Sequence, residues 1–288
     1  MSAKIFVTGA SGQLGHLVIE ALLKKIPAAQ IVAGARTLAK TGDLATQGVE
    51  VREVDYEQPV TLEAALVGID KLLLISSSEI GKRATQHQNV IDAAKKAGIQ
   101  LLVYTSVLHA DNSVLGLAEE HRLTEKALAE SGVSYVVLRN GWYTENYAAS
   151  IPMAVEHGVF LGSAQNGRIS SAARQDYAEA AAVVLTSEEA QSGKTYELAG
   201  DDSYSLAELA AEISRQSGQD VIYQDMPEID YRNALIAAGL PEPLAALLAD
   251  SDTGAAKGAL HDESHSLSQL IGRATTPFSD VVTSVLKA

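Results

Sequence analysis

The chain of 288 residues contains no cysteine. This absence excludes disulfide bonds, thiolate metal ligands and cysteine nucleophiles, and it is typical of proteins from a reducing compartment. Positive charge is also scarce, because 22 lysines and arginines stand against 36 aspartates and glutamates, a formal net charge of −14. Nucleic acid and anionic membranes would repel such a chain, so we expect neither as a partner.

Long apolar runs and a secretory leader are missing as well. No apolar run approaches the ~18 residues that a membrane helix needs, and no basic segment followed by an apolar one precedes the first strand. The composition, 47% hydrophobic and 20% charged residues, is that of a globular protein with a large core. We therefore expect a soluble, cytoplasmic protein, and the sequence leaves monomer or homodimer open.

A glycine-rich opening is the main feature that is present. The apolar run Ile5–Val7 breaks into glycines spaced three apart, and apolar residues then recur along one helical face. Such a turn brings the backbone close to a pyrophosphate and presents unpaired N–H groups to it. The spacing G-x-x-G-x-x-G is a relative of the dinucleotide fingerprint G-x-G-x-x-G. It predicts a dinucleotide site, with an ordinary βα turn as the alternative, lined by Gly9, Ser11, Gly12, Gln13, Leu14 and Gly15.

The end of the second expected strand, Gln30–Ala35, decides between the two nicotinamide dinucleotides. An acid at this point binds the ribose 2′-hydroxyl, whereas an arginine accommodates a 2′-phosphate. Arg36 and Lys40 follow the strand, and no Asp or Glu lies between Ile31 and Gly42. Because a guanidinium can donate two parallel hydrogen bonds to a phosphate, the sequence predicts NADP. The alternative is that Arg36 and Lys40 are only a solvated basic pair on a loop.

Polar residues stand at the ends of the later strands, where open α/β sheets bind ligands. Asp55 and Tyr56 follow the third strand and are expected at the adenine, although Asp55 could equally cap the next helix. The rest of the cofactor is expected to contact three groups of residues: Ser76, Ser77 and Ser78 after the fourth strand, Tyr104, Thr105 and Ser106 at the end of the fifth, and Asn140 after the sixth.

An aromatic cluster follows the sixth strand. The only tryptophan, Trp142, lies within six residues of Tyr143 and Tyr147, beside Asn140 and Asn146. Flat apolar surface with a few polar groups is typical of a pocket for a planar ligand. We therefore expect Trp142, Tyr143, Asn146 and Tyr147 to bind a substrate, the alternative being that these aromatics belong to the core.

Strands alternate with helices from residue 4 to 140. This alternation predicts an α/β fold with a Rossmann-type doubly wound parallel sheet. We expect an NADP-binding domain over residues 1–150 and a smaller α+β substrate-binding lobe over 151–288 that shares strands and packing with it. In the lobe we expect strands at Gly167–Ser171, Thr195–Ala199 and Val221–Gln224, an alanine-rich helix at Gln175–Leu185, and a capping box from Ser205 to Glu208.

With these residues in place, the chain resembles the NmrA-like atypical short-chain dehydrogenase/reductases. Within that group it is most similar to the bacterial NADPH:quinone oxidoreductase branch, to which the triphenylmethane reductases are close. The segments that carry the resemblance are Thr8–Gly15, Leu73–Ser78, Tyr104–Ser106, Leu138–Tyr147, and Ala249–Asp252 with Gly254 and Lys257–Gly258. The resemblance implies bound NADP with Arg36 and Lys40 at the 2′-phosphate.

One departure from the wider group concerns catalysis. Many members use a Tyr-x-x-x-Lys pair as proton donor, but this chain has His121 where relatives carry the lysine and Leu117 four residues before it. His121 with Glu125 is either an oriented proton donor or a structural pair. Quinone reduction tolerates the missing pair, because the phenolate-like product is easily protonated.

We therefore expect an NADPH-dependent oxidoreductase that transfers hydride to quinones or similar planar acceptors, mainly by proximity. Asn146, Tyr143 and His121 are the expected catalytic residues. The alternative is a redox-sensing regulator that binds NADP(H) without turnover, and the missing Tyr-x-x-x-Lys disfavours a sugar-nucleotide epimerase. His109, Asp111 and Ser106 lack the G-x-S-x-G elbow of a hydrolase, and we expect no metal at His261–His265, where acids suit the start of a helix.

Overall fold

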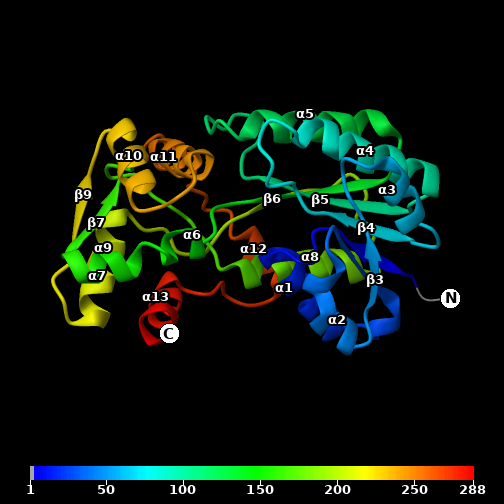
Figure 1. Ribbon diagram of the computed structural model, residues 1–288, viewed down its shortest axis with the longest axis horizontal. Coiled ribbons are helices and arrows are strands. Elements are labelled where there is room, and N and C mark those ends of the chain that lie inside the picture. The colour runs from blue at the N-terminus through cyan, green and yellow to red at the C-terminus, as the bar shows by residue number, and fades with distance from the viewer. Residues whose placement is uncertain (1–2) are drawn as a thin grey trace. The chain divides into compact units, whose positions relative to one another are not determined.

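The computed structural model describes residues 3–288 and contains two compact units (Figure 1). Unit 1 comprises the chain up to Ala110 together with Glu119–Asn140 and Arg174–Glu197. Unit 2 comprises Asp111–Ala118, Gly141–Ala173 and Leu198–Ala288. Both units are discontinuous in sequence, whereas the sequence predicted one boundary near residue 150.

Unit 1 is built on a seven-stranded sheet of order β3-β2-β1-β4-β5-β6-β8. Strands β1 to β6 pair in parallel, so that Val7 lies beside Ala33 on one side and Leu73 on the other. The central strands are apolar on both faces, as helix-covered parallel strands are, which confirms the predicted fold class. The strands are β1 Ile5–Val7, β2 Ile31–Ala35, β3 Glu50–Glu53, β4 Lys71–Leu74, β5 Leu101–Val107, β6 Tyr135–Asn140 and β8 Thr195–Leu198.

Helices lie on both faces of this sheet (Figure 1). On one face α1 packs against α8, and on the other α3 packs against α4. Helix α8 is rich in alanine, and small side chains allow helix axes to approach closely. This packing on α1 places residues 174–186 in unit 1. The helices are α1 Gln13–Leu23, α2 Gly42–Thr46, α3 Pro59–Ala65, α4 Arg83–Ala97, α5 Ala118–Ser131 and α8 Arg174–Thr186, with short 3₁₀ turns η1 Ala28–Gln30 and η2 Leu38–Thr41.

The strand order reverses between β1 and β4. The chain runs outward from β1 to β3 and then returns to β4 on the other side of β1. Ligands of open α/β sheets bind outside the carboxyl ends of the strands at such a reversal. Because β1 ends at Val7 and β4 at Leu74, the glycine turn and the serine segment both begin at this point.

Unit 2 contains a small parallel sheet in which Val159 of β7 lies beside Ile222 of β9. Strand β9 and the capping box from Ser205 to Glu208 confirm the sequence predictions, whereas β7 was not predicted. The elements are α6 Glu145–Ala148, α7 Ile151–His157, β7 Val159–Gly162, α9 Leu206–Ser217, β9 Ile222–Asp225, α10 Glu228–Ala237, α11 Glu242–Ala256, α12 Ser266–Ile271 and α13 Phe278–Lys287.

The strand predicted at Gly167–Ser171 is wrong. Ile169 forms only an isolated bridge with Tyr204. Its neighbour Ser170 donates its N–H to Leu260 and accepts one from Gly200. The backbone groups of this segment are therefore satisfied by several different parts of the chain and not by one partner strand.

Among residues 3–288, the structure contains no helix with the length and hydrophobicity needed to cross a bilayer. The core of unit 1 is formed by short buried strands and by one face of each covering helix. Phe6, Leu72 and Leu102 are fully buried at its centre.

Candidate functional site

The glycine turn has the geometry that its sequence predicts. Gly9 adopts a φ of +61°, in the left-handed region that favours glycine. The Gly12 N–H donates to the Gly9 carbonyl at 2.9 Å and closes the turn. A Cβ at Gly15 would collide with the same carbonyl oxygen, so the helix can begin this close to the turn only because residue 15 is glycine.

The amino end of α1 is available to an anion. Within residues 3–288, no side chain caps this helix at Gly12, and its first turn carries no acidic residue. Ser11, Gly12 and Gln13 are exposed. The unpaired N–H groups and the positive end of the helix dipole therefore face solvent. The turn fits the pyrophosphate of a dinucleotide.

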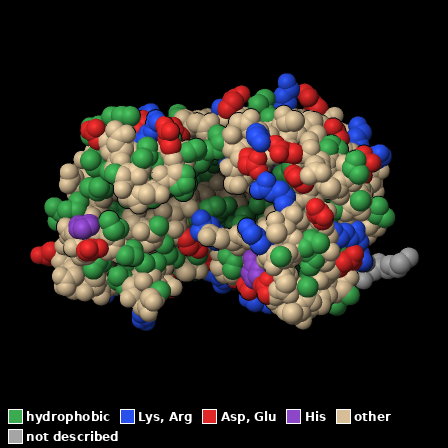
Figure 2. All heavy atoms as spheres, in the orientation of Figure 1, with side chains coloured by type: hydrophobic (Ala, Val, Ile, Leu, Met, Phe, Trp, Pro, Cys, Tyr) green, Lys and Arg blue, Asp and Glu red, His purple; other side chains and the backbone are tan. Residues whose placement is uncertain are grey.

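The predicted 2′-phosphate residues follow β2 on the surface of unit 1. Arg36 and Lys40 are both exposed, with Lys40 in the 3₁₀ turn η2. The Arg36 guanidinium lies 2.6 Å from Glu79, and this contact is the largest factor that lowers the pKa of Glu79. Figure 2 shows basic and acidic side chains intermixed over the elements of unit 1. Arg36 is thus paired at the surface, where a phosphate dianion can compete with a carboxylate.

Asp55 and Tyr56 both take part in the local structure. The two carboxylate oxygens of Asp55 accept from the Glu57 N–H at 2.9 Å and the Gln58 amide at 3.0 Å, in the turn before α3. The N-cap of α3 is Gln58, so Asp55 is not the helix cap that the sequence offered as the alternative. Tyr56 Oη lies 2.5 Å from Thr8 Oγ1 and 2.9 Å from the Ile75 carbonyl. The Tyr56 hydroxyl therefore ties the ends of β1 and β4 together, and an adenine contact by either residue stays a prediction.

The serine segment after β4 is held mainly through its backbone. The Ser76 N–H donates to Thr105 Oγ1 at 2.9 Å, and the Ser77 N–H donates to His87 Nε2 at 2.9 Å. His87 is fully buried, and burial lowers its pKa to about 3. Ser76 and Ser77 are half-buried and Ser78 is exposed, so their hydroxyls lie at the edge where the cofactor is expected.

The hydroxyls of β5 are turned towards neighbouring elements. Tyr104 Oη lies 2.7 Å from His121 Nδ1, and Ser106 Oγ donates to Glu125 at 2.5 Å. Together with the Thr105 contact, these bonds assign all three side chains a structural partner. Cofactor contacts by Tyr104, Thr105 and Ser106 stay a prediction, and Asn140, buried at the end of β6, stays one as well.

The structure does not support His121 as the proton donor. Its side chain is 4% exposed, and burial lowers its pKa to about 3. The imidazole is therefore neutral at neutral pH and has no imidazolium proton to give. His121 is paired with Tyr104, and Glu125 is bound by Arg139. The pair of His121 with Glu125 that the sequence suggested is therefore not formed.

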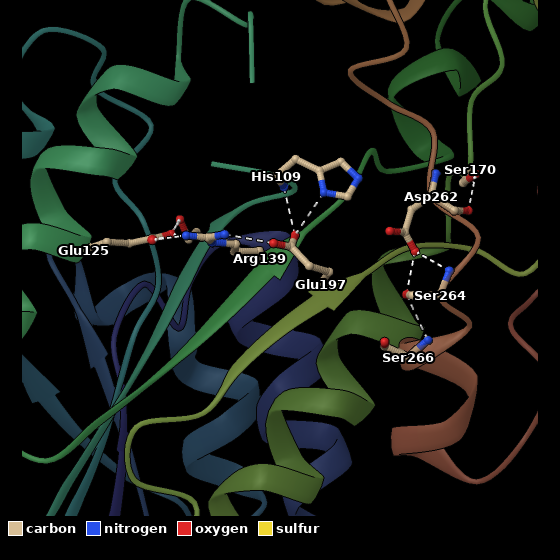
Figure 3. Close-up of polar contacts among 9 residues, drawn as sticks. His109, Glu125, Arg139, Ser170, Glu197, Asp262, Ser264 and Ser266 are labelled. Carbon is tan, nitrogen blue, oxygen red and sulfur yellow. Dashed lines mark hydrogen bonds and ion pairs between the residues drawn. The ribbon is translucent and has the colours of Figure 1, made fainter. Parts of the chain in front are cut away.

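A chain of charges that joins α5 to the carboxyl ends of β6 and β8 was not foreseen from the sequence (Figure 3). Arg139 lies 2.6 Å from Glu125 and 2.8 Å from Glu197, and Glu197 accepts the His109 N–H at 2.8 Å. His109 has a positive φ of 53°, a strained conformation for a residue with a side chain. The Ser106 hydroxyl points to Glu125, which gives no support to a hydrolase triad with His109 and Asp111.

The aromatic cluster of unit 2 divides into buried and accessible residues. Trp142 and Tyr147 are 7% and 3% exposed, whereas Tyr143 and Asn146 are half-buried. The Asn146 N–H donates to the Tyr143 carbonyl at 3.0 Å, which fixes these two residues relative to each other. Trp142 and Tyr147 are core aromatics and Tyr143 and Asn146 are partly exposed; substrate binding by these four residues stays a prediction.

The segment His261–His265 is an irregular loop directly before α12. The Asp262 carboxylate accepts both the N–H and the hydroxyl of Ser264, while the Asp262 backbone exchanges hydrogen bonds with Ser170 Oγ (Figure 3). Within residues 3–288, no group of three or more histidine, aspartate or glutamate side chains is arranged to hold a metal ion.

Comparisons with known proteins extend over nearly the whole chain. A family profile described as NAD(P)H-binding matches residues 9–188. The chain is 58% identical over 278 residues to quinone oxidoreductase 2 of Escherichia coli K12, an alignment that covers 96% of this chain and 97% of that protein.

Solved structures give the same result. The crystal structure of an NADPH-dependent quinone oxidoreductase from Escherichia coli, complexed with NADPH, matches with a TM-score of 0.94 at 57% identity and covers 97% of this chain and 99% of that one. The triphenylmethane reductase of Citrobacter sp., complexed with NADP(H), matches with a TM-score of 0.94 at 39% identity and covers 98% and 100%.

Proposed function

The chain belongs to the NmrA-like family of NAD(P)H-binding proteins, and we propose that it is an NADPH-dependent quinone oxidoreductase. The observation that carries the proposal is the likeness, over nearly the full length of both chains, to a quinone oxidoreductase whose structure contains NADPH. The exposed, uncapped glycine turn of unit 1 supports it independently of that likeness.

The overall reaction is NADPH + H⁺ + quinone → NADP⁺ + hydroquinone. When bound, NADPH supplies the hydride. The residues of unit 1 bind it: the turn from Gly9 to Gly15 holds the pyrophosphate with backbone N–H groups, and Arg36 with Lys40 holds the 2′-phosphate. The segments Ser76–Ser78 and Tyr104–Ser106, together with Asn140, border the nicotinamide.

The acceptor is bound by residues of the aromatic cluster in unit 2. Trp142 and Tyr147 form the buried apolar base of this cluster, while the half-buried Tyr143 and Asn146 supply polar groups. The Asn146 amide donates a hydrogen bond to a quinone oxygen, and a donor of this kind stabilises the charge that develops there as hydride arrives. Hydride addition converts the quinone into a hydroquinone monoanion, a phenolate that takes the H⁺ of the overall reaction from water, so its protonation requires no strong acid and no role for His121.

The test is NADPH oxidation followed spectrophotometrically with benzoquinone-type acceptors. Asn146→Ala is expected to lower kcat/KM by about 10- to 100-fold through loss of one hydrogen-bond donor. Asn112→Ala, at an exposed position of unit 2, is the matched control and keeps wild-type activity. NADPH binding without turnover on any quinone or dye would overturn the proposal and favour the sensor.

A further inference from the structure

Asp252 is a buried acid that the proposed chemistry leaves unexplained. It lies on α11 and is 1% exposed. One carboxylate oxygen accepts the Tyr147 hydroxyl at 3.1 Å, and the other accepts the Ser163 N–H at 2.9 Å. A Cβ at Gly162 would lie 2.8 Å from that second oxygen, so the carboxylate reaches Ser163 across a glycine. Both hydrogen bonds come from neutral donors.

The surroundings of Asp252 explain why its charge is costly. Burial is the main cause that raises its pKa to about 7, with the negative charge of Asp225 adding to it. The Ser163 N–H and the Tyr147 hydroxyl act in the opposite direction. The titratable groups that face Asp252 are Tyr147 on α6, Tyr204 before α9, Tyr223 and Asp225 on β9, and Tyr231 on α10.

The four tyrosines do not titrate in the pH range in which Asp252 does. Burial, with the nearby charge of Asp252, raises the pKa of each phenol above its ordinary value of 10. They stay protonated near neutral pH, so Tyr147 remains a hydrogen-bond donor while Asp252 changes its charge. A hydrogen bond to a charged acceptor is about twice as strong as one between neutral groups.

Tyr147 connects this acid to the residues proposed to bind the acceptor. Its ring lies 6.2 Å from that of Trp142 and meets Phe160 edge-on at 6.1 Å, both measured between centroids. It directly follows Asn146 in the four-residue helix α6, and its N–H donates to the Thr144 carbonyl. So short a helix depends on side-chain anchors, and the bond from Tyr147 to Asp252 joins it to α11.

We propose that Asp252 is a positioning residue for the electron acceptor, which as a carboxylate anchors the Tyr147 hydroxyl and thereby holds Asn146 in place. The inference rests on the proposed function. Protonation of Asp252 removes the charge from this anchor, loosens α6 and weakens acceptor binding. The affinity for the quinone consequently rises with pH through neutrality, while the cofactor site in unit 1 is unaffected.

The kinetic test measures the KM for a quinone between pH 6 and 8.5 at saturating NADPH. The wild-type KM falls by about fivefold across this range, and kcat changes little. Asp252→Asn, which cannot titrate, has a KM that is independent of pH. Asp250→Asn is the matched control on the same helix: Asp250 accepts the Gly116 N–H at 2.8 Å, and its variant keeps the wild-type profile.

Tyr147→Phe tests the route of the effect. This variant keeps Asp252 and its titration but lacks the hydroxyl that transmits it, so its KM is also expected to be independent of pH. It serves as the second variant if Asp252→Asn does not fold. A pH-dependent KM that survives in Tyr147→Phe would overturn the proposal, as would a wild-type KM that does not change with pH.

Trp142, the only tryptophan in the chain, supplies a readout that needs neither cofactor nor acceptor. Its fluorescence is expected to titrate near pH 7 in the wild type and in Asp250→Asn, and to stay constant in Asp252→Asn. A fluorescence titration that persists in Asp252→Asn would show that Asp252 is not the titrating group. Absence of quinone turnover in every variant would instead refute the proposed function, and with it the acceptor role, even where the fluorescence titrates.

Discussion

Arg36 shows how a single residue can select the cofactor. In the structure it is paired with Glu79 at 2.6 Å, and its side chain is 61% exposed. An ion pair this exposed contributes about 0–1 kcal/mol. A phosphate dianion with several acceptor oxygens binds a guanidinium more strongly, so the pair with Glu79 does not prevent Arg36 from binding the 2′-phosphate.

Arg36→Asp is expected to weaken NADPH binding by about 10- to 100-fold, the contribution of a charge-assisted hydrogen bond. Binding of NADH, which lacks the 2′-phosphate, is expected to change little. Titration calorimetry with both cofactors measures the difference. Lys126→Ala, on the exposed face of α5, is the control. Equal weakening of both cofactors would show that Arg36 does not recognise the phosphate.

The buried histidines of unit 1 show a second effect of single residues. The Thr124 hydroxyl donates to the Glu120 carbonyl at 2.9 Å, so His87 Nδ1 must donate to Thr124 Oγ1. His87 Nε2 accepts the Ser77 N–H, which leaves a neutral ring with its proton on Nδ1. Burial, together with the smaller effect of the Arg83 charge, lowers the pKa of both His87 and His121 to about 3.

These lowered pKa values predict how stability depends on pH. Between about pH 6.5 and 3 the unfolded chain binds protons that the folded chain excludes, so stability falls as the pH drops below 6.5. His121→Gln removes one such site. Its free energy of unfolding should therefore lose less between pH 7 and 5 than the wild type, by up to about 2 kcal/mol.

Urea unfolding at the two pH values measures this difference. His157→Gln, at the exposed end of α7, is the control and retains the wild-type dependence. An unchanged pH dependence in His121→Gln would mean that the imidazole is charged in the folded protein, and the proton-donor role would have to be considered again.

At the scale of elements, the junction of β1 and α1 is the most constrained part of unit 1. A Cβ at position 15 collides with the Gly9 carbonyl, whereas one at Gly42 meets no atom within 4 Å. Gly15→Ala is therefore expected to open the turn, lower the melting temperature and weaken NADPH binding by about tenfold or more. Gly42→Ala is the matched control, with a helical φ of −61°. Wild-type NADPH affinity in Gly15→Ala would show that the turn is not the pyrophosphate site.

The elements of unit 1 could be predicted because each obeys one local rule. Fully apolar runs such as Leu72–Leu74 become central strands, and helical periodicity after Gly12 becomes α1. Local rules do not say which distant segment satisfies a backbone group. Among the described residues 3–288, Gly167–Ser171 does not form the expected strand, because Ile169 and Ser170 bond to separate segments. The same limit explains why β7, which pairs with the distant strand β9, was not predicted.

At the scale of the molecule, the sequence predicted the fold class, the family and the cofactor. It did not predict which polar side chains are used internally. Asp55, Tyr104 and Ser106 looked available at strand ends, yet each has a structural partner. The chain from Glu125 through Arg139 to Glu197 joins residues from three elements, and no spacing in the sequence indicates such a contact. Asp252 was missed for the same reason.

The proposed function requires hydride transfer from NADPH to a quinone on this protein. Single-turnover kinetics test it directly: the protein is mixed with NADPH without oxygen, a quinone is added, and the NADPH absorbance is followed. We expect one NADPH to be consumed per quinone, at a rate that saturates with quinone and slows when C4 of the nicotinamide carries deuterium in place of the transferred hydrogen. Bound NADPH whose absorbance does not change on addition of quinone would contradict the proposed function.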